Sequence, residues 1–271
     1  MIPRILIVAG SDSGGGAGIQ ADIKTVTMLG GYAMTAITAI TAQNTLGVQA
    51  VHQVPTDIVV AQMRSAIDDL GVDAVKIGMI GSAATAQAVA DVLEPLDVPI
   101  VFDPVMVATS GSILADVDTI AAFERLMRRA AIVTPNLPEL AALGGEAAVR
   151  ATGAAVLVKG GHAEGPVVED RLVTPDGETL WTHPRIDTRH THGTGCTLAS
   201  GIAAGLAQGM GLAQACDRAI AFVGAALDRA PGLGDGHGPL GHALGRTPYY
   251  DLLTAADPDG WDSAAFAAKW S

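Results

Sequence analysis

Aromatic residues are scarce in this sequence, making up 4% of its 271 residues, and it contains only two cysteines, Cys196 and Cys216. Two cysteines are too few for a disulfide framework, so we expect reduced thiols and a cytoplasmic location. The apolar run at residues 5–9 is too short for a signal peptide, and no run approaches the length of a membrane helix. The sequence therefore predicts a cytoplasmic protein with no membrane partner.

Positive charge is also scarce, because 16 Lys and Arg residues face 28 Asp and Glu residues and give a formal net charge of −12. A chain of this charge repels polyanions, which argues against nucleic acid as its main partner. An anionic ligand would need a local site of its own. The abundant residues are apolar (49%) and glycine (33 residues). This composition favours buried parallel strands of aliphatic residues and closely packed helices.

Short apolar runs alternate with stretches of helical periodicity along the chain. We predict buried strands at residues 5–9 and 74–77, further strands at 32–42, 48–54, 100–102, near 132 and at 155–158, and helices at 19–29, 56–70 and 82–93. Residues 170–174 and 178–182 predict an antiparallel hairpin around Pro175-Asp176-Gly177. Strands that alternate with helices imply right-handed crossovers. We therefore expect one α/β domain in three layers, α/β/α, with a mainly parallel central sheet plus a small antiparallel hairpin.

The segment from His190 to Gly201 combines a glycine turn, Gly193-Thr194-Gly195, with a small-residue pattern that predicts a helix from about Cys196 to Gly209. A helix start offers unpaired N–H groups and the positive end of the helix dipole, which together make an anion site. The same positive end is expected to lower the pKa of Cys196 and favour its thiolate as a base or nucleophile. A glycine-rich helix cap with a structural cysteine fits the pattern equally well.

Polar residues follow several of the predicted strands where these end. Gln43 can donate and accept at once, as an amino-substituted heterocycle requires, although a surface glutamine fits equally well. Asp103 and Glu139 supply two carboxylates at one sheet edge, which suits Mg²⁺ held through water, whereas either alone is typical of a cap or surface charge. Lys159 adds a cation at that edge. The glycine-rich loop at residues 10–18 matches neither the dinucleotide nor the phosphate-loop pattern, and favours a close-approach loop that lines a small-molecule pocket.

Seven segments, in order along residues 5–242, resemble the hydroxymethylpyrimidine/phosphomethylpyrimidine kinases of thiamine biosynthesis, a family of the ribokinase-like superfamily. They are residues 9–22, 41–45, 76–79, 103–106, 134–139, 158–162 and 191–197. The resemblance implies a ribokinase-like kinase domain at 1–245 and a C-terminal extension at 246–271 that packs on the body or on a partner subunit. It also implies ATP-dependent phosphorylation of 4-amino-5-hydroxymethyl-2-methylpyrimidine and then of its monophosphate.

Individual roles also follow from the resemblance, position by position. Gln43 matches the residue that hydrogen-bonds the aminopyrimidine, and the positions that line or support its pocket are matched by Gly10, Ala17, Asp22, Met79 and Val105. The catalytic positions are matched by Gly193, Thr194 and Gly195 of the anion hole and by Cys196 as the base. Asp103 and Glu139 match the acids associated with Mg²⁺, and Lys159 falls on the nucleotide side. The resemblance further implies a homodimer, and it leaves the need for a monovalent cation open.

Other interpretations of these residues stay open. A pyridoxal or pyridoxine kinase of the same superfamily is the main alternative, although Gln43 and Met79 favour the pyrimidine. Cys196 with His190 or His192 would suit a cysteine hydrolase, and a non-catalytic pyrimidine sensor would use the same pocket. An NAD-binding oxidoreductase is disfavoured by the missing dinucleotide pattern. The connection at residues 140–158 is shorter than is usual in the family, so nucleotide binding transfers less safely than pyrimidine binding.

Overall fold

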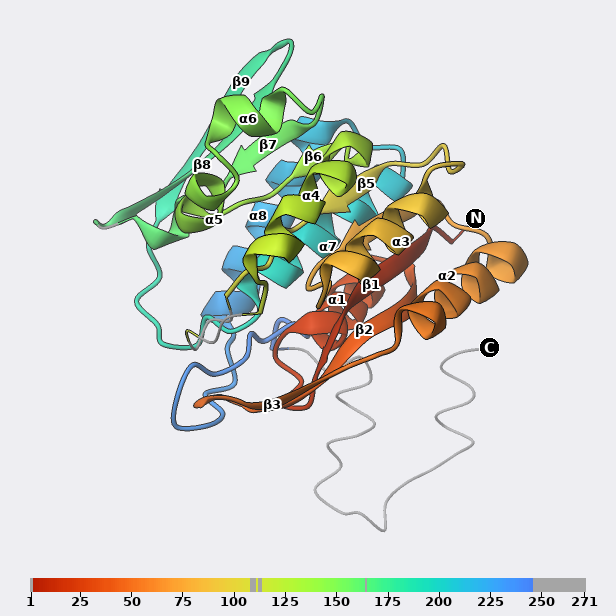
Figure 1. Ribbon diagram of the computed structural model, residues 1–271. Helices are drawn as coiled ribbons and strands as arrows, with labels where there is room; N and C mark the ends of the chain where they lie inside the picture. The colour runs from red at the N-terminus through yellow and green to blue at the C-terminus, as the bar shows by residue number, and fades with distance from the viewer. Residues whose placement is uncertain (1, 108–110, 112–113, 164, 246–271) are drawn as a thin grey trace, which may run out of the picture.

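The computed structural model describes residues 2–107, 111, 114–163 and 165–245. The extension at 246–271, for which we expect packing on the body or a partner, lies outside the described residues. Within the described residues, nine strands form a single sheet in the order β3-β2-β1-β4-β5-β6-β7-β8-β9 (Figure 1). The strands are β1 (Arg4–Asp12), β2 (Tyr32–Asn44), β3 (Gly47–Gln53), β4 (Ala74–Ile77), β5 (Ile100–Phe102), β6 (Ile132–Val133), β7 (Ala155–Val158), β8 (Val167–Thr174) and β9 (Gly177–Pro184).

The middle of the sheet is parallel and both of its edges are antiparallel. Strands β2, β1, β4, β5, β6 and β7 run in one direction. At one edge β3 pairs antiparallel with β2, and at the other the β8–β9 hairpin continues antiparallel from β7. The predicted mainly parallel sheet with an antiparallel hairpin is therefore confirmed.

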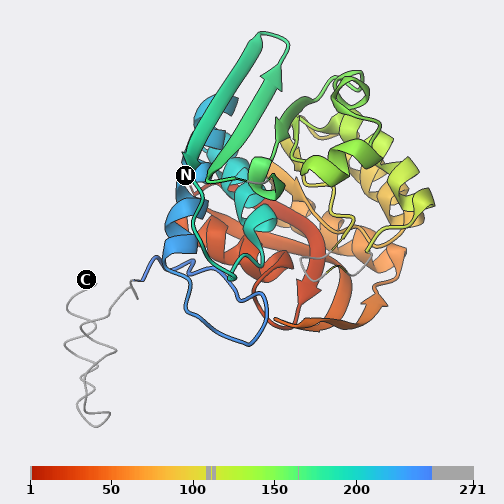
Figure 2. The same ribbon diagram turned by 90° about the vertical axis from the view of Figure 1, so that its left-hand side faces the viewer.

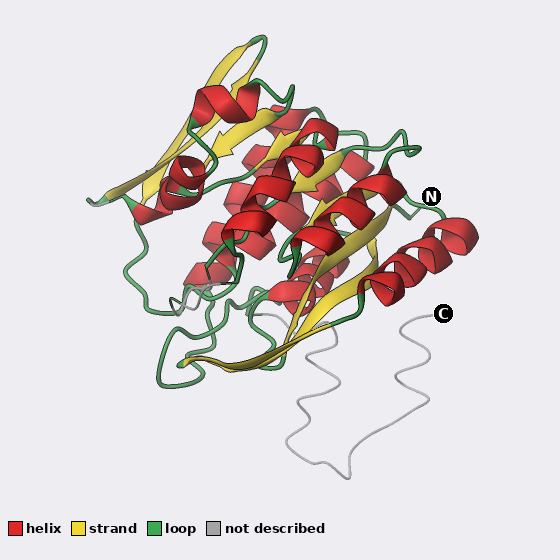
Figure 3. Ribbon diagram, viewed as in Figure 1, coloured by secondary structure: helices red, strands yellow, loops and turns green. Residues whose placement is uncertain are grey.

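Helices cover both faces of the sheet, which gives the predicted three layers (Figures 1 and 3). One face carries α2 (Thr56–Leu70), α3 (Ala83–Leu93), α4 (Val117–Arg129), α5 (Leu137–Ala142) and α6 (Glu146–Arg150). The other carries α1 (Gly18–Met28), α7 (Thr194–Ala207) and α8 (Leu212–Asp228). None of the helices in these described ranges is long and apolar enough to cross a membrane.

The alternation of side chains along β1 shows how the sheet feeds both cores. Leu6 and Val8 point into the cluster under α2, α3 and α4, whereas Ile5 and Ile7 point into the cluster under α1, α7 and α8. All four side chains have no exposed surface. Because a strand buried on both faces reads as a continuous apolar run, the sequence locates β1 without indicating which helices cover it.

The order of strands places an opening at the carboxyl ends of β1 and β4. The chain leaves β1 through α1 on one face to reach β2, and it reaches β4 through α2 on the opposite face. In open α/β sheets such a switch in direction leaves a crevice beyond the strand ends, and ligands bind there. The residues that follow β1, β4, β5, β6 and β7 all meet at this edge.

A segment that the sequence did not mark out closes this edge from outside. After α8, residues 233–242 run past the β2–β3 turn and along the start of α7, and we call them the closing segment (Figure 2). The amide of His237 donates to the carbonyl of Thr45 at 2.9 Å, and the amide of His192 donates to the carbonyl of Gly238 at 3.1 Å. The helix α8, which positions this segment, and α4 were not among the predicted helices.

Candidate functional site

The N-terminus of α7 lies at the centre of the site. Gly193 is its N-cap with φ 90°, a left-handed conformation that disfavours other residues. A Cβ on Gly193 would lie 1.9 Å from the carbonyl oxygen of Gly16, so the glycine-rich loop after β1 packs directly on this turn. The helix begins at Thr194, two residues before the predicted start. Its first turn therefore includes Thr194, Gly195 and Cys196, whose position favours N–H groups free of intrahelical partners.

Three of the predicted charged residues meet beside this helix start. The Lys159 ammonium lies 2.8 Å from Oδ1 of Asp103 and 3.7 Å from Oε2 of Glu139. Thr134 donates to the same Oδ1 of Asp103 at 3.0 Å. A Cβ on Gly195 would lie 3.3 Å from Lys159 Nζ and 3.4 Å from Asp103 Oδ2, so the predicted anion hole borders this cluster. The structure thus brings together residues that come from β5, β6, β7 and α7.

The charged groups of this cluster shift one another's pKa values. Burial lowers the pKa of Lys159, but the carboxylates of Asp103 and Glu139 outweigh it and hold that pKa above its usual value. Burial raises the pKa of Glu139, and the nearby Lys159 offsets only part of the rise. Glu139 also accepts from the backbone amide of Asn136 in a capping box at the start of α5. Lys159 is therefore a permanent cation between two acids.

Cys196 departs from the sequence prediction. Burial raises its pKa to about 11, whereas the helix position predicted a lowered value. The carboxylates of Asp22 and Asp103 add to the rise, and Lys76 together with the amide of Gly18 lowers the pKa by less than burial raises it. The prediction was wrong because desolvation of the thiolate outweighs the favourable end of the helix dipole. At neutral pH Cys196 is a thiol.

A buried ion pair lies beneath the site. The Lys76 ammonium contacts both carboxylate oxygens of Asp22 at 3.0 and 2.8 Å, and Ser200 donates to Asp22 at 2.7 Å. Both side chains of the pair are fully buried. Burial lowers the pKa of Lys76, but the carboxylates of Asp22 and Asp103 outweigh it and keep the ammonium protonated. Asp22 therefore supports the site from within the core and has no exposed surface to offer a ligand.

The predicted pyrimidine-side residues lie around the ends of β1, β2 and β4. The backbone amide of Gln43 donates to the Ser13 hydroxyl at 2.8 Å, which ties the end of β2 to the glycine-rich loop. A Cβ on Gly10 would meet the sulfur of Met79 at 3.0 Å, so these two residues pack directly. Ala17 donates to the buried carboxylate of Asp12 at 2.8 Å. Val105 is half-buried, two residues beyond Asp103 in the β5 turn.

Residues to which the sequence gave no role in a kinase also belong to the site. They are Asp12, Lys76, His192 and, in the closing segment, His242. Nε2 of His242 lies 2.9 Å from the hydroxyl of Thr197 in the first turn of α7. Burial lowers the pKa of His242 to about 4, so this imidazole is neutral. Asp12, Lys76 and His192 all stand inside the motifs quoted above, but their partners lie far away in the sequence.

Neither candidate histidine makes the pair that a cysteine hydrolase would need. Nε2 of His192 lies 2.9 Å from Asp12, and the buried Nδ1 of His190 has no hydrogen-bond partner among the residues that the structure describes. Among the described residues, no hydrogen bond joins Cys196 to a histidine. A thiol with a raised pKa and no adjacent imidazole is a poor nucleophile.

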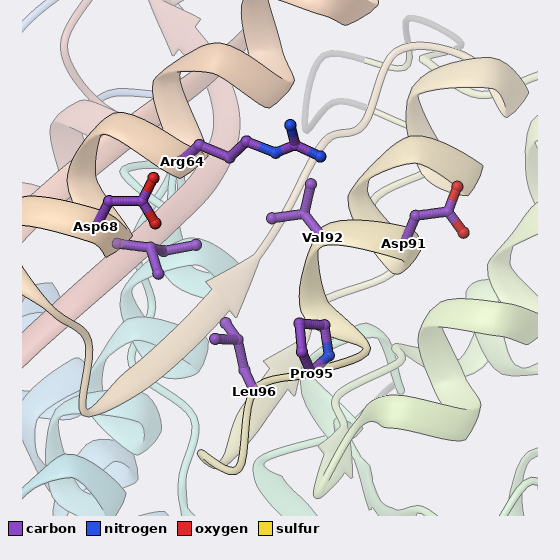
Figure 4. Close-up of a pocket in the computed structure, with 7 residues that line it drawn as sticks. Arg64, Asp68, Asp91, Val92, Pro95 and Leu96 are labelled. Carbon is purple, nitrogen blue, oxygen red and sulfur yellow. The ribbon is translucent and has the colours of Figure 1, made fainter.

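A separate cavity of about 470 Å³ lies between α2 and α3 (Figure 4). Arg64 and Asp68 line it from α2 and Asp91 from α3. The carboxyl-terminal halves of α2 and α3 line this cavity, and they lead into the amino ends of β4 and β5. The charged cluster lies at the carboxyl ends of the strands, so the cavity is at the opposite edge of the sheet. It is therefore unrelated to the site described above.

The sequence was compared with known proteins. The family model for phosphomethylpyrimidine kinase matches residues 12–241. A hydroxymethylpyrimidine/phosphomethylpyrimidine kinase of Rhizobium meliloti (strain 1021) is 50% identical over 256 residues, which cover 88% of this chain and 96% of the relative. The chain belongs to the phosphomethylpyrimidine kinase family. The matched range includes residues 12–18 of the glycine-rich loop and residues 233–241 of the closing segment.

Solved structures of this family and of a neighbouring activity share the fold. The pyridoxal kinase of Bacillus subtilis, determined as an ADP complex, gives a TM-score of 0.83 at 32% identity and covers 90% of this chain and 98% of that one. The phosphomethylpyrimidine kinase from Clostridium difficile 630 gives 0.72 at 34% identity and covers 83% of this chain and 98% of that one. The predicted ribokinase-like fold is therefore confirmed, and the same fold serves both activities.

Proposed function

We propose that this chain transfers a phosphoryl group from ATP to the hydroxymethyl group of 4-amino-5-hydroxymethyl-2-methylpyrimidine, and then phosphorylates the monophosphate, in thiamine biosynthesis. The observation that carries the proposal is the junction of the α7 N-terminus with Lys159 and Asp103, in a chain of the phosphomethylpyrimidine kinase family. Phosphoryl transfer needs in-line positioning and charge neutralisation more than covalent chemistry. A helix start beside a permanent cation supplies both.

Each group in the site has a distinct part in this reaction. The amides of Gly193, Thr194 and Gly195 are proposed to hold the transferring phosphoryl group, because a helix N-terminus favours negative charge. Lys159 faces the nucleotide side and neutralises phosphate charge. Cys196 stands in the first turn of α7 and is proposed to receive the proton of the substrate hydroxyl. With a pKa of about 11 it does so as the small fraction that is thiolate, because a thiol already carries its proton.

Mg²⁺ is the proposed metal, and the residues present suit it in a limited way. Asp103 and Glu139 offer two carboxylates, and no cluster of three or more His, Cys, Asp or Glu residues that could hold a metal occurs in the part of the chain described. Two carboxylates suit Mg²⁺, which keeps several waters and takes further ligands from phosphates. When bound, the ion would neutralise phosphate charge. Asp103 and Glu139 would hold it through water, since Lys159 already occupies the space between them.

The proposal is tested by ATP consumption with Mg²⁺ and three acceptors: the hydroxymethylpyrimidine, its monophosphate and pyridoxal. We expect turnover of both pyrimidines. Pyridoxal turnover alone would move the protein to the alternative, a pyridoxal kinase, the activity that the same fold serves in the Bacillus subtilis enzyme. Running each reaction with and without K⁺ tests the need for a monovalent cation. Absence of any acceptor-dependent turnover would direct attention to the short connection at 140–158 and to a pyrimidine sensor.

Replacing Gln43 with alanine is expected to raise KM for the hydroxymethylpyrimidine about tenfold or more, since it removes at least one hydrogen bond from the bound ring. The matched control is Gln49→Ala, because Gln49 is an exposed glutamine of neighbouring β3. Steady-state kinetics of both variants decide the point. Equal KM values for the two variants would show that Gln43 does not bind the substrate ring.

Substitution of Cys196 by alanine is expected to lower the first phosphorylation by roughly 10²–10⁴, the usual worth of a general base. The second should fall far less, because a phosphate acceptor needs no base. Below the thiol pKa of about 11 the thiolate fraction grows tenfold with each pH unit. The wild-type first step should therefore rise from pH 7 to 9, and the variant should lose that slope. Equal losses in both steps would contradict the assignment.

Under this proposal the partners are the pyrimidine, ATP and a second copy of the chain, in the cytoplasm. Two free cysteines support a reducing compartment. The homodimer rests on the family resemblance alone, and light scattering of the purified protein checks it.

A further inference from the structure

The carboxylate of Asp12 gathers four donors at the mouth of the site. It accepts the backbone amides of Gly14, Gly16 and Ala17 at 2.8, 2.9 and 2.8 Å, and Nε2 of His192 lies 2.9 Å from its Oδ2. Burial raises the pKa of Asp12, but these hydrogen bonds together outweigh it and hold the pKa below its usual value. Asp12 is therefore an ionised, acceptor-only group at neutral pH.

An acceptor-only neighbour determines where the proton of His192 lies. Because Oδ2 of Asp12 has no hydrogen to give, Nε2 of His192 must carry the proton in their 2.9 Å contact. His192 is buried, and its backbone amide is held by the carbonyl of Gly238 in the closing segment. The ring thus presents a fixed N–H at the point where the glycine-rich loop, β2 and α7 meet.

The side-chain amide of Gln43 lies between this N–H and the Thr41 hydroxyl. One end of the amide is 3.3 Å from Nε2 of His192, and the other is 3.1 Å from Oγ1 of Thr41. Thr41 has one hydroxyl hydrogen for two partners, the carbonyl of Ser11 at 3.0 Å and the Gln43 amide at 3.1 Å. Because the Ser11 carbonyl can only accept, both contacts are satisfied only when Thr41 donates to Ser11 and accepts from Gln43. If the amide nitrogen of Gln43 faced His192, two N–H donors would meet. If the amide oxygen faced the hydroxyl oxygen of Thr41, two acceptors would meet. A half-turn of the amide, which leaves its shape unchanged, removes both conflicts: its oxygen then shares the single Nε2 hydrogen of His192 with Asp12, and its nitrogen donates to Thr41.

We propose that His192 and Thr41 are positioning residues that orient the Gln43 amide, with its oxygen toward His192 and its nitrogen toward Thr41. This inference rests on the proposed function, in which Gln43 reads the substrate ring. In the proposed orientation one lone pair of the oxygen and one N–H of the nitrogen remain free for a ligand. The ligand must then place a donor on the His192 side and an acceptor on the Thr41 side.

This order of groups selects a class of substrate. A heteroaromatic ring with an amino group next to a ring nitrogen offers a donor and an acceptor side by side, in the sense that the amide requires. A ring that carries two acceptors there accepts from the free N–H but leaves the lone pair of the Gln43 oxygen without a donor, and an unpaired buried polar group is costly. His192 and Thr41 therefore contribute to the choice of substrate ring, although neither is assigned a contact with that ring.

The first measurement is the tautomer of His192 in the ligand-free protein. Long-range ¹H–¹⁵N correlation spectra of protein labelled with ¹⁵N-histidine distinguish a proton on Nε2 from one on Nδ1. We expect Nε2–H, with the His192 signals assigned by their loss in His192→Ala. A ring protonated only on Nδ1 overturns the proposal. This readout does not depend on any activity, so it stays informative when the wild-type chain turns over no pyrimidine and the proposed function fails.

The second measurement is a set of KM values for the hydroxymethylpyrimidine. Thr41→Val removes the acceptor for Gln43 in an isosteric side chain and should raise KM about tenfold, the worth of a well-placed hydrogen bond, whereas Thr41→Ser should restore the wild-type value. In a Gln43→Ala background, Thr41→Val and His192→Ala should each change KM by less than about twofold, because residues that act through one partner are not additive. Additive effects in that background, with folding intact by circular dichroism, would show a merely structural role and overturn the proposal.

Discussion

Replacement of Lys76 by methionine is expected to lower the free energy of unfolding by about 3–5 kcal/mol, the usual cost of leaving one member of a buried ion pair unpaired. Both side chains of the Lys76–Asp22 pair are fully buried, with a closest contact of 2.8 Å. The variant leaves the Asp22 charge with Ser200 as its only hydrogen-bond donor in the described part of the chain. Urea unfolding measures the loss as a shifted midpoint with an unchanged slope.

Two further variants separate the buried charge from other causes. Arg125→Met removes the cation of an exposed pair with Asp91, and it should cost no more than about 1 kcal/mol. Adding Asp22→Asn to Lys76→Met should recover much of the lost stability, since no charge is then buried without its partner. A loss for Lys76→Met as small as that of Arg125→Met would mean that water or another cation compensates Asp22.

Replacement of Gly193 by alanine is expected to reduce turnover on the order of 10²–10³, the effect of losing an oxyanion contact. At φ 90° an alanine is strained, and its Cβ would lie 1.9 Å from the carbonyl oxygen of Gly16. Because that atom belongs to the backbone, either the glycine-rich loop or the start of α7 must move. The amides proposed to hold the phosphoryl group would then leave their positions.

Gly209→Ala is the matched control for this substitution. Gly209 follows the opposite end of α7, has φ 82°, and a Cβ there would meet nothing within 4 Å. This variant carries the backbone strain without the clash, so it should lose about 1–3 kcal/mol of stability while its kcat stays near wild type. If Gly193→Ala keeps the kcat of Gly209→Ala, the start of α7 does not hold the phosphoryl group.

The sequence predicted that the charged residues of the site meet, because parallel strands have their carboxyl ends at one edge of the sheet. The strands at 74–77, 100–102 and 155–158 were located correctly, since each is a short run that is apolar except for Lys76 and is followed closely by a glycine or proline. Their carboxyl ends lead to Met79, Asp103 and Lys159. The meeting of Asp103, Glu139 and Lys159 therefore followed from topology and needed no knowledge of side-chain packing.

The tertiary structure decided the chemistry of individual groups. The pKa of Cys196 depends on how much solvent the surrounding side chains exclude, and a helix position in the sequence carries no information about that exclusion. Lys76 and Asp22 are 54 residues apart, and His192 and Asp12 are 180 apart. Such pairs form only when the sheet and α7 come together, so no local pattern marks them. The sequence by itself determined where the site lies, and the packing around it determined which of its groups are charged and where their protons lie.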